Sequence, residues 1–325
     1  MSFHWILAAS RFSIRPEIEN GMKARALWGG LAVEAESASE VAIFGMPYDG
    51  AVGWRQGAAQ APARLREISA SSPAVSEEGF VVTPERLRVV DLGDAAIEEN
   101  ESRETYFARI QTRITAEMRE HPRRLLFSIG GDHSVSIPLL RAFDAASTEP
   151  YGVVLVDAHP DLFDVYDDSK LSHACPMRRA LETNGLAPEH LLIIGTRSYN
   201  PEELDFMSDQ GIAFVPARQV ARDGVGASIA LAGTRLAGLE RVYLTIDIDA
   251  VDPAYAPGTG APVAGGLTSR DLFELVRGLL ESLPVRAMDV VEVAPPLDPT
   301  DATSFLALQL VFEVLACHAR AAATP

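Results

Sequence analysis

The segment VVLVDAHPDLFD, residues 153–164, ends an apolar run with two acids and an imidazole. Asp157, His159 and Asp161 follow one another at alternate positions. Side chains at alternate positions of a strand lie on the same face, so we expect these three to point the same way for as long as the strand continues. An apolar strand that ends like this delivers charged and metal-ligating groups to the edge of a sheet.

Three other apolar runs are followed by residues of the same kinds. His133 stands in SIGGDHS, Asp247 and Asp249 stand in TIDID and are expected to share a face, and Glu292 stands in DVVEV. Each segment alone can be a polar turn or a helix cap, and Glu292 alone can pair with an arginine. Four strand ends that all carry buried acids or histidines need a common explanation.

A pair of divalent metal ions explains these residues together. Burying several carboxylates without a cation is too costly, and four aspartates match the charge of two dications. Carboxylates with two imidazoles suit Mn²⁺ better than the thiolate-rich sites of structural zinc. The sequence therefore predicts two Mn²⁺ ions per chain, and Co²⁺, Ni²⁺, Fe²⁺ or Zn²⁺ could use the same ligands. The candidate ligands are His133, Asp157, His159, Asp161, Asp247 and Asp249.

Eight short apolar or β-branched runs could position these ligands as strands. They lie at residues 41–45, 87–93, 124–131, 151–158, 190–196, 212–216, 241–249 and 285–293. Helices are expected at residues 61–70, 102–120, 134–146, 201–210, 225–239, 268–281 and 302–320, with Thr268 as one N-cap. Such continuous hydrophobicity is typical of strands buried on both faces. The alternation predicts one α/β domain with a mostly parallel eight-stranded sheet and a site at its carboxyl edge.

The composition excludes several classes of partner. The chain has 325 residues, 47% of them hydrophobic, and a formal net charge of −17. This charge argues against binding to nucleic acid, which requires basic surface, and against adhesion to anionic membranes. No uncharged apolar run is long enough to predict a membrane span. Two cysteines far apart in the sequence fit a reducing cytoplasm, so we expect a cytoplasmic protein.

The beginning of the chain is set apart from the domain. The first residues lack the basic segment of a signal peptide, and Met22 could be an alternative start. We therefore treat residues 1–35 as an N-terminal arm or an uncertain start, and residues 36–322 as a single catalytic domain.

Together the motifs resemble the ureohydrolases, the family of arginase, agmatinase and formimidoylglutamase. GGDHS, DAHPD, TIDIDAVDPAYAPGTG and DVVEVAPPLD carry the resemblance, which continues through residues 45–67 and 172–182. It implies a three-layer α/β/α sandwich around an eight-stranded parallel sheet and assembly into homo-oligomers, as trimers or hexamers. It also implies hydrolysis of a guanidino compound to urea and an amine.

The resemblance assigns a role to each site residue. One metal ion would be bound by His133, Asp157, Asp161 and Asp247, and the other by His159, Asp157, Asp247 and Asp249. Glu292 and Thr259 would hold the guanidinium group. Asp161 would accept a proton from the attacking water, and His173 would pass a proton to the leaving amine. From the residues alone, His173 could equally be a loop residue bonded to backbone.

Departures from the family pattern bear on the substrate. Thr245 replaces a usual serine, and Ala174 and Cys175 follow His173 where glycine and a small residue are common. Residues 162–172 lack the pattern with which arginases grip an amino acid, and Asp164 with its acidic neighbours would attract a cationic tail. Agmatine, cleaved to putrescine and urea, is therefore the favoured substrate.

Other readings stay open at the level of sequence. Arg178 and Arg179 could hold the acid end of a guanidino acid such as 4-guanidinobutanoate. Arginase, guanidino-acid hydrolase (for example guanidinobutyrase) and formimidoylglutamase activities are the alternatives within the family. A metal-dependent deacetylase would need a tandem histidine pair, which the sequence lacks. A non-catalytic homologue would be expected to have lost a metal ligand, and none is lost.

Overall fold

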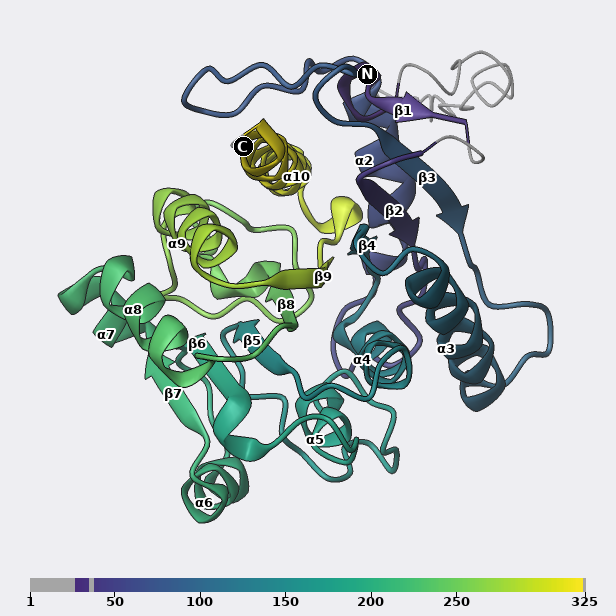
Figure 1. The fold of residues 1–325 in the computed structure, drawn as a ribbon. Helices are drawn as coiled ribbons and strands as arrows, with labels where there is room; N and C mark the ends of the chain where they lie inside the picture. The colour runs from purple at the N-terminus through teal and green to yellow at the C-terminus, as the bar shows by residue number, and fades with distance from the viewer. Residues whose placement is uncertain (1–26, 35–37, 324–325) are drawn as a thin grey trace, which may run out of the picture.

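The computed structural model describes residues 27–34 and 38–323. Within these residues nine strands form one sheet in the order β1-β3-β2-β4-β9-β8-β5-β6-β7, and all neighbours are parallel (Figure 1). The strands are β1 (Ala32–Val33), β2 (Val41–Gly45), β3 (Val89–Asp94), β4 (Leu125–Ile129), β5 (Gly152–Val156), β6 (Leu191–Thr196), β7 (Ala213–Pro216), β8 (Val242–Asp247) and β9 (Val285–Val291).

The predicted parallel α/β sheet is confirmed, with one strand more than expected. Each of the eight predicted strands is present, and the additional strand β1 is a two-residue strand that pairs with β3 at the edge of the sheet. β1 falls in the segment 1–35 that was set apart as an arm. Residues 1–26 of that segment lie outside the described residues.

Helices cover both faces of the sheet and complete three layers. On one face α2, α10, α9, α8 and α7 pack side by side in that spatial order, and α3, α4, α5 and α6 cover the other face (Figure 1). α5 and α7 are too short to show a helical period in the sequence and were not predicted. The helices are α1 (Leu27–Gly30), α2 (Ala61–Ser69), α3 (Arg103–Glu120), α4 (Ser136–Ala145), α5 (Pro176–Ala180), α6 (Pro201–Gln210), α7 (Ala217–Asp223), α8 (Val225–Arg235), α9 (Ser269–Ser282) and α10 (Ala302–Ala323).

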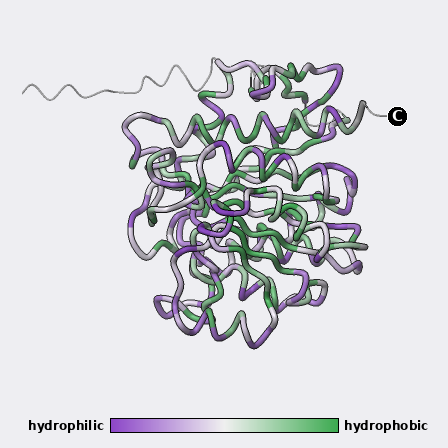
Figure 2. Tube along the Cα trace, turned by 90° about the vertical axis from the view of Figure 1, so that its left-hand side faces the viewer, coloured by the Kyte–Doolittle hydropathy of each residue, from purple (hydrophilic) through white to green (hydrophobic). Residues whose placement is uncertain are grey.

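The hydrophobic core lies in two clusters, one on each face of the sheet. Every residue of β5 and β8 is buried, so apolar side chains at successive positions pack alternately into the two clusters. Hydrophobic segments accordingly occupy the interior of the trace, and hydrophilic ones its periphery (Figure 2). Local signals agree with this packing: Thr268 caps α9 as predicted, and its hydroxyl accepts from the Asp271 amide.

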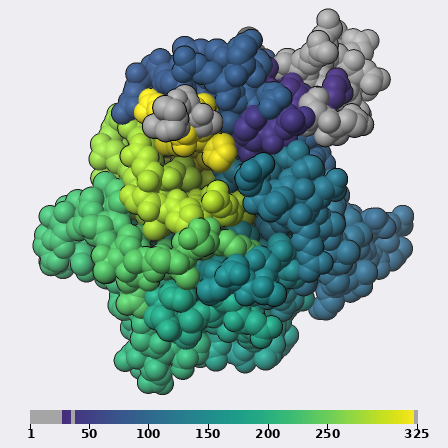
Figure 3. Space-filling view, viewed as in Figure 1, coloured from purple at the N-terminus to yellow at the C-terminus, as the bar shows by residue number. Residues whose placement is uncertain are grey.

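Helix α10 is the one described helix that is long and apolar enough to cross a membrane by length and composition. Its segment Ala302–Ala321 has a mean hydropathy of 1.5, and 72% of the apolar window is buried inside the protein. The helix packs between α2 and α9, and in the space-filling view it lies among their segments (Figure 3). This burial is typical of a core helix.

His318 on α10 provides a test of stability against pH. Burial lowers the pKa of His318 below the ordinary 6.5; Glu40 opposes this shift, whereas Arg286 adds to it. The unfolded chain therefore takes up a proton below about pH 6.5 that the folded chain refuses, so the free energy of unfolding falls as the pH falls through that value. We expect His318→Gln to lose less stability between pH 7.5 and 5.5 than the wild type, measured by urea unfolding with chelator present. Equal losses in both proteins would contradict this.

Candidate metal centre

Four neighbouring strands bring the predicted site residues to one edge of the sheet. β4, β9, β8 and β5 are adjacent, and their carboxyl ends lead in that order to His133, Glu292, Asp247 and Asp157. Side chains from four distant parts of the sequence therefore converge on one place. This is the edge at which parallel α/β sheets bind ligands.

Turns, and not the alternation of side chains along a strand, orient the candidate ligands Asp161 and Asp249. β5 ends at Val156, and Asp161 has a left-handed backbone with φ of 53°. Asp249 lies in the 3₁₀ turn η5 (Ile248–Ala250), which begins directly after β8 ends at Asp247. The strand does not continue as far as Asp161, so alternation does not apply to that residue, and the expectation that alternation orients Asp249 is wrong. Glu292 is also left-handed, with φ of 61°, and such strained non-glycine residues gather at functional sites.

Carboxylate oxygens surround one nitrogen of each histidine. Nδ1 of His133 lies 3.1 Å from Asp157, 2.9 Å from Asp161 and 3.2 Å from Asp247. Nδ1 of His159 lies 3.4 Å from Asp157 and 3.1 Å from Asp249. Two groups of possible metal ligands result, one of His133, Asp157 and Asp247 and one of Asp157, His159 and Asp249. Asp157 belongs to both groups, as expected of a shared ligand, whereas Asp247, which was also expected to be shared, belongs to the first group alone.

The hydrogen bonds behind His133 orient its ring and determine which of its nitrogens faces the carboxylates. Thr245 donates its hydroxyl hydrogen to Asp289, at 2.6 Å, so it can only accept from Nε2 of His133, at 3.0 Å. Nε2 therefore carries a proton, and Nδ1 is the nitrogen that faces the carboxylates. Burial lowers the pKa of His133, but the charge of Asp161 and the hydrogen bonds with the carboxylates around Nδ1 raise it well above its ordinary 6.5. Among the described residues neither this buried Nδ1 nor Asp157 Oδ2 has a hydrogen-bond partner. Three carboxylates around one buried imidazole nitrogen need a positive charge at that place, which a metal ion can supply in place of a proton.

The electrostatics of the carboxylates lead to the same conclusion. Burial raises the pKa of Asp247 well above its ordinary value, and the charges of Asp249 and Asp157 raise it further. Burial likewise raises the pKa of Glu292, with a contribution from Asp132. Ionised carboxylates in this cluster repel one another, and divalent cations would offset that repulsion. The donor set therefore fits metal ions held by oxygen and imidazole ligands.

The centre opens into a cavity of about 270 Å³. His133, His159, Asp161, Asp247 and Asp249 line its inner end. Two predicted catalytic side chains, Glu292 and His173, also line it. The cavity is therefore a place where a small molecule could contact the metal ligands and both of these residues.

Thr259 and Asp164 do not line the cavity. Thr259 is buried beside it, and its hydroxyl oxygen has no hydrogen-bond partner among the described residues. Asp164 is half-exposed and its carboxylate is paired with the buried Arg179 at 2.6 Å. Arg179 already neutralises the carboxylate that was expected to attract a cationic tail. The geometry therefore does not support Asp164 as a substrate-binding residue.

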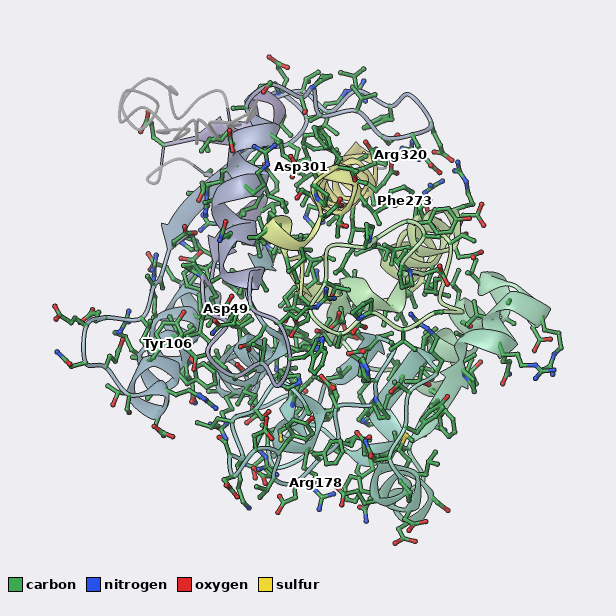
Figure 4. All side chains as sticks on the ribbon, turned by 180° about the vertical axis from the view of Figure 1, so that it is seen from behind. Asp49, Tyr106, Arg178, Phe273, Asp301 and Arg320 are labelled. Atoms are coloured by element: carbon green, nitrogen blue, oxygen red, sulfur yellow. The ribbon has the colours of Figure 1, made fainter. Side chains whose placement is uncertain are left out.

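Arg178 and Arg179, which could have bound a carboxylate, are also engaged elsewhere. Arg179 is fully buried between Asp164 and Glu182. Arg178 stacks on the ring of Phe206 at 3.6 Å and lies at the periphery of the molecule (Figure 4). Neither side chain lines the cavity around the metal ligands.

The sequence analysis missed several residues of the cavity wall, among them Trp54, Arg55 and Glu203. Burial raises the pKa of Glu203 to about 7, although this carboxylate accepts hydrogen bonds from the amides of Leu162 and Asn200. The spacing of Asn200 and Glu203 is a capping-box signal at the start of α6, and it could have been recognised. Nothing in the sequence near Trp54 and Arg55 indicates which cavity they face.

The missing side chain of Gly131 lets the loop that carries His133 lie directly against the backbone of Tyr48. A Cβ at Gly131 would lie 1.7 Å from the carbonyl oxygen of Tyr48, and the Gly131 carbonyl accepts from the Glu292 amide. We expect Gly131→Ala to lower the free energy of unfolding by about 3 kcal/mol, because backbone must move, and to weaken metal binding. Calorimetry and metal analysis would measure both.

Gly226→Ala is a matched control for this substitution. Gly226 lies in α8 with open space around its missing Cβ, so alanine should raise stability by about 0.5–1 kcal/mol and leave metal binding unchanged. A Gly131→Ala protein as stable as Gly226→Ala would contradict the close approach of the two loops.

Residues 39–317 match the sequence model of the Arginase family. The chain belongs to the arginase family. It is a hydrolase that acts on carbon–nitrogen bonds of linear amidines, as its family relatives are. The predicted family, fold and enzyme class are therefore confirmed.

Relatives with different names resemble this arginase-family chain to a similar degree. It is 36% identical to guanidinopropionase of Pseudomonas aeruginosa over 292 residues, which is 88% of this chain and 89% of that protein. It is 36% identical to agmatinase of Citrobacter koseri over 289 residues, 86% of this chain and 88% of that protein. The solved structure of proclavaminate amidino hydrolase from Streptomyces clavuligerus matches with a TM-score of 0.81 at 31% identity, covering 91% of this chain and 97% of that one.

Proposed function

We propose that the protein hydrolyses a guanidino compound to urea and an amine at a dinuclear metal centre, with agmatine as the substrate and putrescine as the amine product. The observation that carries the proposal is the position of Nδ1 of His133, which faces the carboxylates of Asp157, Asp161 and Asp247 in the wall of a cavity. Mn²⁺ is the proposed metal, because carboxylates and two imidazoles make up the donor set.

The six predicted ligands would hold the two ions, with Asp157 and Asp247 proposed as ligands of both. When bound, two divalent ions would lower the pKa of a water molecule towards neutrality and so supply a nucleophile strong enough for a resonance-stabilised guanidinium carbon. Asp161 is proposed to accept the proton of the attacking water, since its carboxylate lies at the centre and lines the cavity.

Glu292 is proposed to orient the guanidinium group. Its Oε1 accepts from the His133 amide at 2.8 Å, so the carboxylate is held in place against the loop that carries a metal ligand. Its Oε2 lies on the side of Gly260, another cavity residue, and remains available for a charge-assisted pair with the guanidinium. The unpartnered hydroxyl of the neighbouring Thr259 is proposed to support the same group.

His173 is proposed to pass a proton to the leaving amine. Its Nδ1 lies 2.6 Å from the carbonyl oxygen of Ala51. A carbonyl oxygen only accepts, so Nδ1 carries a proton and Nε2 is left to take up a proton and hand it on. The position of His173 on the cavity wall supports this role.

Agmatine is favoured by the acidic group in the wall. Glu203 is almost fully buried, and an amine tail would stabilise its ionised form. Arg55, which also lines the cavity, favours a second candidate substrate, a guanidino acid such as 3-guanidinopropanoate or 4-guanidinobutanoate. Homo-oligomeric assembly and a cytoplasmic location remain predictions from the family resemblance and the composition.

Urea release by the Mn²⁺-loaded protein tests the proposal. Agmatine, arginine, 4-guanidinobutanoate and 3-guanidinopropanoate would be assayed in parallel, with Asp249→Ala as the blank. Turnover of agmatine that is lost in the variant would support the proposal. Turnover of a guanidino acid would replace agmatine by the second candidate. Silence on all four, with two metal ions bound per chain, would contradict both.

A further inference from the structure

Trp54 stands at the mouth of the cavity with 80% of its surface exposed. It is the most exposed of the large hydrophobic side chains in the described part of the chain. An indole left in water at the rim of a binding cavity loses the free energy that burial of its large apolar area would provide. Such a side chain is suited to being covered by a ligand.

The loop that presents Trp54 is held at several points. Asp49 accepts hydrogen bonds from the amides of Gly57, at 2.7 Å, and Ala59, at 3.3 Å. The Ala51 amide donates to Asp132 at 2.8 Å. The exposure of the indole therefore does not follow from a loose loop, because the backbone on both sides of Trp54 is tied to its surroundings.

Gly53 brings this loop directly against the opposite wall of the cavity. A Cβ at Gly53 would lie 3.1 Å from the Tyr166 ring, 3.2 Å from the His173 ring and 3.3 Å from the Asp167 carboxylate. Trp54 is thus the first side chain of the loop beyond this contact. The rings of Phe163 and Tyr166 are edge to face at 5.2 Å, and both line the cavity. We call Trp54, Phe163 and Tyr166 the aromatic mouth.

An aromatic mouth with carboxylates beside it fits a cation. Ring faces attract ammonium groups, most strongly the indole of tryptophan. Asp167, beside Gly53, and Glu203, in the cavity wall, supply carboxyl groups that an ammonium group could pair with. Arg55, the cation of this wall, already donates to the carbonyl oxygens of Thr259, at 2.9 Å, and Gly260, at 3.1 Å. These hydrogen bonds hold the guanidinium of Arg55 against the wall, so it opposes a cationic tail less than a free guanidinium would.

We propose that Trp54 determines specificity by contacting the distal end of the substrate and favouring a cationic over a neutral or anionic tail. This inference rests on the proposed guanidino hydrolysis and deepens it. The metal centre and Glu292 would hold the guanidinium end. The aromatic mouth would hold the amine end, with the indole face over the ammonium group.

The test compares three guanidino compounds that differ in their tails: agmatine, n-butylguanidine without the amine, and 4-guanidinobutanoate with a carboxylate. In the Mn²⁺-loaded protein Trp54→Ala is expected to raise KM for agmatine about tenfold, with a much smaller rise for n-butylguanidine and a kcat for agmatine within about threefold of the wild type. Trp54→Phe keeps a ring and should retain most of the affinity. Phe305→Ala, which removes an exposed ring outside the cavity, should change neither KM.

Fluorescence gives a readout that does not depend on turnover. Agmatine should change the tryptophan emission of the wild type and leave that of Trp54→Phe unchanged. Equal rises in KM for agmatine and n-butylguanidine would overturn the proposal, as would a larger rise for 4-guanidinobutanoate. A change of oligomeric state in Trp54→Ala would overturn it too and assign the indole to an interface between copies of the chain.

The two proposals fail in different ways. If the wild type releases urea but Trp54→Ala behaves like the wild type, only the specificity inference is wrong. If no guanidino compound yields urea, the proposed function is wrong. In that case an agmatine-dependent emission change confined to proteins with Trp54 would still support the binding site, and the absence of any change would overturn it.

Discussion

Asp157→Ala is expected to remove both metal ions and to lower urea release by on the order of 10³-fold or more. Asp157 is fully buried and belongs to both groups of metal ligands, so its loss opens both sites at once. Metal-assisted activation of water contributes several kcal/mol of transition-state stabilisation, and each 1.36 kcal/mol corresponds to about tenfold in rate. Metal analysis after gel filtration and a urea assay would measure the two effects.

Thermal unfolding shows whether the loss is one of metal binding or of folding. Mn²⁺ at about 100 times its dissociation constant should stabilise the wild type by about 2.7 kcal/mol and leave Asp157→Ala unaffected. Asp223→Ala, at the exposed end of α7, is the matched control and should behave like the wild type. An Asp157→Ala protein that still binds two ions per chain would refute the shared-ligand assignment.

Glu292→Gln is expected to lower kcat/KM by about 10²- to 10³-fold while both metal ions stay bound. The amide keeps the shape of the side chain and an oxygen that can accept from the His133 amide. It loses the charge that would pair with the guanidinium, and removing one partner of a buried charged pair costs about 2–5 kcal/mol. Steady-state kinetics on the accepted substrate, with metal content measured on the same samples, would test this.

Glu274→Gln, an exposed glutamate on α9, controls for loss of a glutamate charge as such and should keep wild-type kinetics. Wild-type kcat/KM in Glu292→Gln would rule out the proposed orientation of the guanidinium. Loss of metal in this variant would instead show that Glu292 supports the His133 loop more than it supports the substrate.

Much of the fold was predictable because its signals are local. The eight longer strands are runs of apolar residues. A strand that is buried on both faces needs apolar side chains at successive positions, whichever strands lie beside it. The cap at Thr268 likewise depends on residues within one turn. β1, α5 and α7 were missed because elements of two to seven residues carry no readable period.

The residue types of the candidate ligands were predictable because they are also local signals, whereas the directions in which their side chains point were not. Asp-x-His-x-Asp and Asp-x-Asp at strand ends are visible in the sequence, and their combined charge requires cations. The left-handed backbone of Asp161 and Glu292 is not visible, because it is strained locally and is held by contacts with the loops around it.

By itself, the sequence determined the alternation of strands and helices, the candidate metal ligands and the family. These properties depend on residue type and on spacing within single segments. Only the tertiary structure decided that β4, β9, β8 and β5 are neighbours, since strand order depends on long crossovers that leave no mark at the strands themselves. It also decided that the charge of Asp164 is used by Arg179 and that Trp54 stands at the mouth of the cavity. Such pairings join residues whose distance in space has no relation to their distance in the chain.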